Sequence, residues 1–161
     1  MTPAETFAIR TATSADEIPR VERMWLALYE LQRQQGMQMV PPPGAFALWA
    51  SSMKPTLGRF GQLFLAEGSG ALIGFLAARV RSAPPWFGGA TVGFVSEVWV
   101  DPEARGRRVG ERLVRAAEEW FRGQGIERAE LQVMATNDAA RALYRRLGWD
   151  DELLQMTRRL A

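Results

Sequence analysis

The chain of 161 residues contains no cysteine, no histidine and a single lysine, Lys54. The lack of cysteine excludes disulfides and thiol chemistry. The lack of histidine removes the commonest catalytic base and metal ligand, so we expect no metal site. The sequence also has neither the Gly-Lys-Ser/Thr end of a Walker phosphate loop nor the dinucleotide fingerprint G-x-G-x-x-G, which excludes the two commonest nucleotide loops.

The sequence also lacks long apolar runs and a large excess of positive or negative charge. Hydrophobic residues make up 47% of the chain and charged residues 24%, with a net charge of +2 and acidic residues interspersed among the arginines. This composition is typical of a globular protein, and it provides no long basic arm for nucleic acid. The chain start, with Glu5 and no apolar core, does not resemble a signal peptide, so we expect a cytoplasmic protein that binds no membrane. Because no repeat or linker divides the sequence, we expect one domain over residues 1–161.

Segment 98–110 joins the end of a β-branched strand to a basic turn that contains two glycines. Apolar residues then recur at helical spacing as far as Phe121, so a helix begins near residues 105–108. The first N–H groups of a helix have no intrahelical partner and carry the positive end of its dipole, so they bind anions. Gly106 and Gly110 let the backbone approach such an anion closely. The turn therefore predicts a phosphate site, with a solvated, arginine-rich helix start as the alternative.

Segment 137–149 follows a predicted strand at 130–135 and has the pattern of a short helix. Asn137 is a good N-cap, apolar residues form a stripe at helical spacing, and Gly148 stands where a left-handed C-cap is favoured. These residues alone indicate only a helix, on which Tyr144 could be a half-buried packing side chain.

Together the two segments resemble the acyl-CoA-binding motifs of the GNAT superfamily of N-acetyltransferases. Arg105 falls on the first position and Gly110 on the last position of that family's R/Q-x-x-G-x-G/A loop. Residues 137–149 resemble its N-x-x-A-x-x-x-Y-x-x-x-G-F segment. Arg108 stands where the family usually has its first glycine, and we expect it to have the negative φ of a first-turn helical residue. The resemblance implies acetyl transfer from acetyl-CoA to an amine.

The resemblance also implies how acetyl-CoA is held. Two neighbouring parallel strands splay apart and admit the pantetheine arm, which the strand backbone and Asn137 contact, while residues 105–111 hold the diphosphate. The residues expected to bind the co-substrate are Val98, Trp99, Val100, Arg105, Gly106, Arg107, Arg108, Val109, Gly110, Glu111 and Asn137.

Two residues are expected to be catalytic. Without cysteine or histidine, we expect direct attack by the amine in a ternary complex rather than a covalent acyl-enzyme. The resemblance implies that Tyr144 protonates the departing sulfur. Glu97 is the candidate base because it lies on the strand that leads to the acetyl group, and the alternative is an exposed or ion-paired structural glutamate. Strict alternation places Val95, Glu97 and Trp99 on one face of this strand, although a bulge would change that pattern.

The fold expected is α/β (α+β): a GNAT-like mixed, mostly antiparallel central sheet of six to seven strands flanked by about four helices. The expected helices outside the two motif segments are Ala15–Gln35 and Ala45–Met53. The expected strands are Phe7–Arg10, Gln62–Glu67, Leu72–Arg81, Thr91–Val100, Glu130–Ala135 and Leu154–Leu160.

The acceptor is expected to be a small-molecule amine, because only a few residues separate Trp149 from the expected terminal strand, where family members that acetylate peptide amino termini usually carry a longer hairpin. Two alternatives stay open, a protein or peptide amine as acceptor and a module that binds acyl-CoA without catalysis. The terminal segment is rich in apolar residues and predicts a homodimer, since an apolar edge needs a cover; these residues are Leu153, Leu154, Met156 and Leu160. The candidate walls of the acceptor pocket are Tyr29, Met37, Met39, Phe46, Trp49, Trp86 and Phe87.

Overall fold

The computed structural model describes residues 6–160. The signal-peptide prediction concerns residues 1–5, which lie outside the described part. Within residues 6–160, no helix is both long enough and apolar enough to cross a membrane. In the same part of the chain, no group of three or more His, Cys, Asp or Glu side chains is placed to hold a metal ion.

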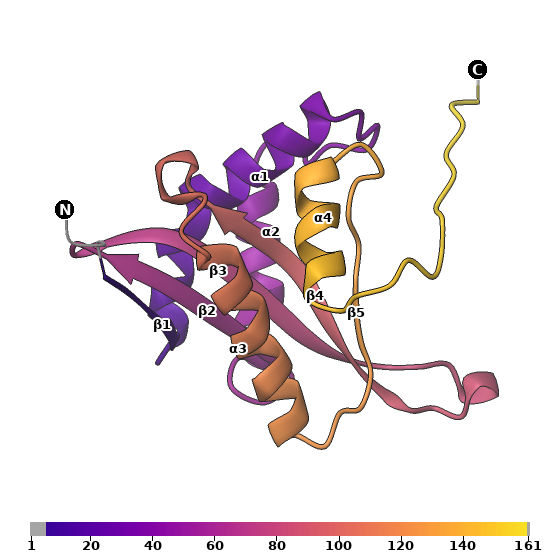
Figure 1. Cartoon of the computed structure of the whole chain (residues 1–161). Helices are drawn as coiled ribbons and strands as arrows, with labels where there is room; N and C mark the ends of the chain where they lie inside the picture. The colour runs from indigo at the N-terminus through magenta and orange to yellow at the C-terminus, as the bar shows by residue number, and fades with distance from the viewer. Residues whose placement is uncertain (1–5, 161) are drawn as a thin grey trace.

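A five-stranded sheet in the order β1-β2-β3-β4-β5 forms the middle of the molecule (Figure 1). Strands β1 to β4 are antiparallel to their neighbours, and β4 and β5 are parallel. The strands are β1 (Phe7–Thr11), β2 (Gly61–Gly68), β3 (Ala71–Ser82), β4 (Thr91–Val100) and β5 (Ala129–Leu131). The α-helices are α1 (Glu22–Gln34), α2 (Ala45–Met53), α3 (Val109–Gly123) and α4 (Asp138–Arg146).

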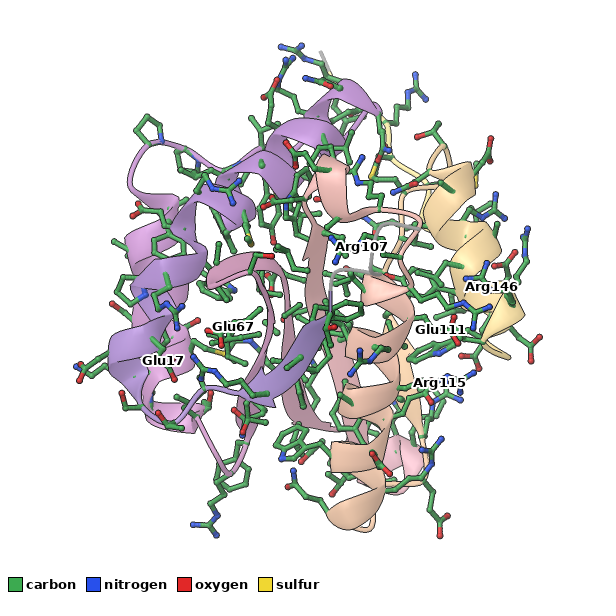
Figure 2. All side chains as sticks on the ribbon, turned by 60° about the vertical axis from the view of Figure 1, so that its left-hand side comes forward. Glu17, Glu67, Arg107, Glu111, Arg115 and Arg146 are labelled. Carbon is green, nitrogen blue, oxygen red and sulfur yellow. The ribbon has the colours of Figure 1, made fainter. Side chains whose placement is uncertain are left out.

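Helices cover both faces of the sheet, with α1 and α2 on one side and α3 and α4 on the other (Figure 2). Alternation along β2 explains the two cores, because Leu63 and Leu65 pack toward α1 and α2 while Phe64 packs toward α3. Residues 61–66 are buried throughout. Burial on both faces therefore accounts for the apolar run in β2.

The expected mixed, mostly antiparallel sheet with four helices is confirmed, but the expected six to seven strands are wrong, because the sheet has five strands within residues 6–160. Segment 154–160 is exposed and has no regular secondary structure. The strand expected at 130–135 is reduced to Ala129–Leu131. A strand needs a hydrogen-bonded neighbour, and β5, with three residues, offers few backbone groups with which residues 154–160 could pair.

The helix expected over residues 15–35 is divided. Residues Ala15–Val21 form a 3-10 helix, η1, and α1 begins at Glu22. Pro19 lies inside η1 and has no N–H to donate to the preceding turn, which explains the late start of the α-helix.

Four charged side chains tie η1 to the β1–β2 edge of the sheet (Figure 2). Glu17 accepts from Arg10 at 2.6 Å and from Arg20 at 2.9 Å, and Glu67 accepts from the same arginines at 2.9 and 3.0 Å. Glu17 also accepts from the backbone N–H of Thr13 at 2.7 Å. The hydrogen bonds from Arg10 and Thr13 lower the pKa of Glu17 to about 2.

We predict that Glu17→Gln lowers the free energy of unfolding by about 1 kcal/mol at pH 7, because it removes the carboxylate shared by both arginines. The folded-state pKa of Glu17 lies below its ordinary value of 4.5. The stabilisation is therefore present above that ordinary value and is lost as the pH falls toward the folded-state pKa. Urea unfolding at pH 7 and pH 3 should show the two proteins converge at the lower pH. Glu22→Gln, at an exposed position, is the control, and equal losses in both variants would contradict the prediction.

Candidate active site

A cleft opens where β4 and β5 separate. The two strands pair only at Gly93–Ala129, Phe94–Glu130 and Val95–Leu131, and beyond Val95 the described partner of β4 is β3 alone. The end of β4 supplies one wall of the cleft and the chain from β5 to α4 supplies the other, with α1 closing one side. The lining residues include Gln32, Glu97, Val98, Met134, Asn137 and Tyr144.

A β-bulge at Ser96 sets the direction of the side chains in this wall. Ala77 pairs with Glu97 and Ala78 with Val95, so Ser96 is the extra residue on β4. Val95 packs in the core beneath α3, whereas Trp99 packs in the core beneath α1 and α2. Strict alternation is therefore wrong for Val95, because the extra residue reverses the pattern and only Glu97 and Trp99 share a face.

The same bulge turns the N–H groups of Val98 and Val100 toward the cleft. The N–H of Asp101 donates to a β3 carbonyl at 2.9 Å, and the N–H of Gly93 donates toward the β5 side at 2.9 Å. Successive N–H groups along a strand alternate between its two edges. Counting back from Asp101, those of Val100 and Val98 lie on the edge that faces away from β3. Among the described strands, none lies beside these two N–H groups to accept a hydrogen bond from them.

The Glu97 carboxyl is buried in the β4 wall of the cleft and accepts hydrogen bonds from two hydroxyl groups. The residue is 6% exposed. The Tyr29 hydroxyl donates to Oε1 at 3.0 Å, and the Ser96 hydroxyl donates to Oε2. Burial raises the pKa of Glu97, against the opposing effects of both hydroxyls and the positive charge of Arg79. A carboxylate with a raised pKa is a stronger base than an ordinary glutamate.

Tyr144 lies on the opposite wall, on α4. Its ring packs against the apolar side chains beneath α3 and lies 6.2 Å from the Trp149 ring. Burial raises the pKa of the Tyr144 phenol to about 12. No hydrogen bond of its hydroxyl to another described residue is present in residues 6–160. The phenol is therefore neutral at physiological pH and carries its proton.

The basic turn leads into α3 as the sequence predicts, but the helix begins later, at Val109. Arg108 is the N-cap residue and has φ of 63°. The expected negative φ at Arg108 is wrong, because the position lies in the left-handed region that favours the glycine usual in this motif. Gly110 lies against α4, and a Cβ there would be 3.4 Å from Leu143 Cδ2.

The other side chains of the turn point in several directions. Arg105 Nε donates to the carbonyl of Val100 at 3.1 Å, which ties the turn to the end of β4. Arg107 lies toward β1, with its guanidinium carbon 5.9 Å from the Phe7 ring centroid. Gly106 is exposed and Val109 is buried beneath α3. Only the backbone of Val109 is therefore available to a ligand.

Glu111 on α3 reaches toward α4, and Asn137 stands at the start of α4 beside the cleft. Glu111 Oε1 lies 3.4 Å from Arg115 Nε, and Glu111 Oε2 lies 3.8 Å from Arg146 Nη2 (Figure 2). Asn137 Oδ1 accepts from the Ala140 N–H at 3.1 Å and caps α4, as predicted, while its side chain also lines the cleft.

The aromatic and methionine residues expected to line an acceptor pocket lie in three places. Phe46 and Trp49 pack with Trp25 and Tyr29 in the core beneath α1 and α2. Trp86 and Phe87 are 80% and 75% exposed at the end of the β3–β4 hairpin. Met39 is 86% exposed and Met37 is half-buried, both in the loop before α2.

The sequence did not identify Tyr29 and Ser96 as partners of Glu97. Tyr29 is 68 residues from Glu97 along the chain, and no spacing rule connects residues so far apart. Ser96 adjoins Glu97, and strict alternation places their side chains on opposite faces. Only the bulge brings the Ser96 hydroxyl to the carboxyl.

Comparison with known proteins agrees with this geometry. The family model of the acetyltransferase (GNAT) family matches residues 25–149. The chain belongs to this family. Mycothiol acetyltransferase of Saccharomonospora viridis is 42% identical over 89 residues, which are 54% of this chain and 29% of that protein. The chain thus spans less than a third of the length of this curated relative.

Solved structures of other proteins have the same fold over nearly the whole length of this chain. A mutant of the BH1408 protein from Bacillus halodurans matches with a TM-score of 0.78 and 19% identity, covering 96% of this chain and 99% of that one. Aminoglycoside N-acetyltransferase AAC(6')-Iy in complex with CoA matches with a TM-score of 0.70 and 18% identity, covering 100% and 99% of the two chains. At this level of identity the likeness establishes the fold.

Proposed function

We propose that this GNAT protein is an N-acetyltransferase that transfers the acetyl group of acetyl-CoA to a primary amine of a small molecule, by direct attack in a ternary complex. The observation that carries the proposal is the cleft between β4 and β5, which has Glu97 on one wall and Tyr144 on the other. Family membership and the likeness to a CoA-bound acetyltransferase support acetyl-CoA as the co-substrate.

The backbone around the cleft provides the contacts that acetyl-CoA needs. The N–H groups of Val98 and Val100 face the space that the pantetheine arm would occupy, and Asn137 lies across it. The first-turn N–H groups of α3 bind the diphosphate, with the helix dipole favouring its charge. Arg105 holds this turn against the end of β4 through the Val100 carbonyl.

The reaction needs two proton transfers, and one residue on each wall of the cleft carries out one of them. Glu97 accepts a proton from the amine nitrogen as that nitrogen bonds to the thioester carbonyl carbon. The carbon–sulfur bond then breaks, and Tyr144 gives its proton to the leaving sulfur. Tyr144 recovers a proton from solvent as Glu97 releases one, so the net change moves one proton from the amine to the thiol.

A small-molecule acceptor is supported by the relatives that carry acetyltransferase names. One is named for mycothiol and others for aminoglycosides, which are small molecules. The alternatives are a protein or peptide amine, and acyl-CoA binding without catalysis. Thiol release measured with a panel of amines and peptides separates these three outcomes, because CoA binding without any turnover would support the non-catalytic module.

We also propose that the chain forms a homodimer through residues 150–160. This segment runs free of the sheet (Figure 1), and its apolar side chains are exposed, including Leu153 at 92% and Met156 at 86%. β5 lies at the end of the sheet order and pairs with β4 alone among the described strands. The apolar segment and the uncovered edge of β5 complement each other in a second copy.

We predict that Gly110→Asp weakens acetyl-CoA binding at least tenfold, or about 1.4 kcal/mol, because it adds a negative charge to the first turn of α3, which we propose binds the diphosphate. Isothermal titration calorimetry measures the dissociation constant. Gly110→Ala is the control, because its Cβ meets Leu143 at an ordinary contact distance of 3.4 Å. An unchanged constant for a folded Gly110→Asp variant would contradict binding at the α3 N-terminus.

We predict that Tyr144→Phe lowers kcat by roughly 10- to 10⁴-fold and leaves acetyl-CoA affinity little changed, because the ring is kept and the proton is lost. The measurement is steady-state thiol release under conditions where chemistry limits the rate. Full turnover in the variant would make Tyr144 a packing residue and water the proton source.

We predict that Glu97→Gln lowers activity most at neutral pH and that rising pH partly restores it, because the amine then loses its own proton. In the wild-type protein, activity should fall as the pH drops through the raised pKa of Glu97, where the base becomes protonated. A pH profile of kcat/KM tests both statements. Equal losses at all pH values would contradict a role as base.

We predict that light scattering at micromolar concentration gives the mass of two chains. Met156→Asp should shift the mass toward one chain, because it places a charge in the apolar contact. Gln155→Asp adds the same charge at a polar position and should leave the dimer intact. A monomeric wild-type protein overturns the proposal.

A further inference from the structure

Four elements place polar groups around the Glu97 carboxyl. Tyr29 approaches from α1, and its hydroxyl is 3.0 Å from Oε1. Ser96 adjoins it on β4, and Arg79 on β3 and Arg81 further along β3 attract its negative charge. Trp49 on α2 lies near the carboxyl, and its buried indole N–H makes no hydrogen bond with a described residue.

Among the donors around Glu97, the Tyr29 hydroxyl has a single acceptor, whereas Ser96 and Arg79 have others within reach. Ser96 has a single hydroxyl proton and two acceptors within reach, the Ala77 carbonyl at 3.2 Å and the Glu97 carboxylate. Arg79 is turned toward Ser52 on α2, where it donates to Oγ at 2.9 Å. The Tyr29 hydroxyl donates to Glu97 alone among the described residues.

The ring of Tyr29 is fixed by its own packing. Its centroid lies 4.4 Å from that of Trp25, which is 3% exposed in the core beneath α1. Burial and the negative charge of Glu97 raise the pKa of Tyr29 well above its ordinary range, so the phenol stays a neutral donor. A hydroxyl on a fixed ring holds a carboxylate in one orientation, whereas a free glutamate side chain samples several rotamers.

We propose that Tyr29 is a positioning residue for this acetyltransferase: its hydroxyl fixes the Glu97 carboxylate at the cleft wall and favours the ionised form that accepts the proton of the amine. The proposal rests on the proposed function, because it assigns Glu97 the role of base. It connects α1 to the reaction through one hydrogen bond that crosses from helix to strand.

The test is Tyr29→Phe, which keeps the ring and removes the hydroxyl. Because the lost hydrogen bond favours the ionised carboxyl, the pKa of Glu97 should rise by about one unit. The acidic limb of the kcat/KM profile should move to higher pH by the same amount. One acceptor amine is used throughout, so its own titration is identical in every variant. Arg79 and Arg81 are unchanged, so their charge does not contribute to the shift.

Trp25→Phe is the matched control. It removes packing against the Tyr29 ring and keeps the hydroxyl, so it should lower the melting temperature and leave the acidic limb in place. A limb that moves equally in both variants overturns the positioning role, because loss of packing would then explain the shift.

A second readout does not depend on activity. Carbon-13 labelling of glutamate carboxyl groups, with Glu97→Gln to assign the signal, gives the pKa of Glu97 directly by NMR. An unchanged pKa in Tyr29→Phe overturns the inference even if activity falls. A raised pKa together with an unmoved kinetic limb overturns the catalytic role of the hydrogen bond. If Glu97→Gln also leaves the limb unmoved in that case, the assignment of Glu97 as base fails separately.

Discussion

The point at which β4 and β5 stop pairing is the constraint on which the site depends. Three residue pairs hold the parallel strands together, and the bulge at Ser96 follows directly. Ending the ladder leaves N–H groups of β4 without a strand partner, which is costly in a dry interior and favourable where a ligand can accept from them. The extra residue also reverses the side-chain alternation, so that Glu97 faces α1. The end of the β4–β5 pairing thus opens the cleft, and the bulge beside it sets the orientation of the carboxyl.

Burial has different consequences for Glu97 and Tyr144, the two ionisable residues on the walls of the cleft. It raises the pKa of Glu97 above the ordinary value of a glutamate, and it raises the pKa of Tyr144 further above neutral pH. The carboxyl therefore becomes a better base, while the phenol stays protonated. Tyr29 moderates the first effect, because its hydroxyl favours the charge that burial disfavours.

The start of α3 combines an anion-binding backbone with local strain. Arg108 has a positive φ at the N-cap, a conformation that costs an L-residue about 1–2 kcal/mol. The surrounding structure holds it there, because Arg105 ties the turn to β4 and Gly110 lies against α4. The strained residue thus belongs to the element that the family resemblance associates with the diphosphate.

Local patterns in the sequence determined the helices and strands that have strong periodicity or clear boundary residues. The strand Thr91–Val100, the helix Ala45–Met53 and the cap at Asn137 follow from alternation, proline and capping chemistry, which act within a few residues. The two motifs also identified the family, because their residues are close together in the chain. Propensity could not reveal that segment 154–160 forms no strand, since strand formation requires a partner edge.

Only the tertiary structure decided how the site is assembled. The bulge at Ser96 is a property of the β3–β4 register, and the sequence of β4 alone allows strict alternation as well. The contact between Tyr29 and Glu97 joins residues 68 positions apart, and the positive φ of Arg108 belongs to a turn that Arg105 ties to the end of β4. The sequence by itself determined which chemical groups are present and which elements carry them. Their distances, burial and hydrogen bonds depend on long-range packing, which local residue preferences do not encode.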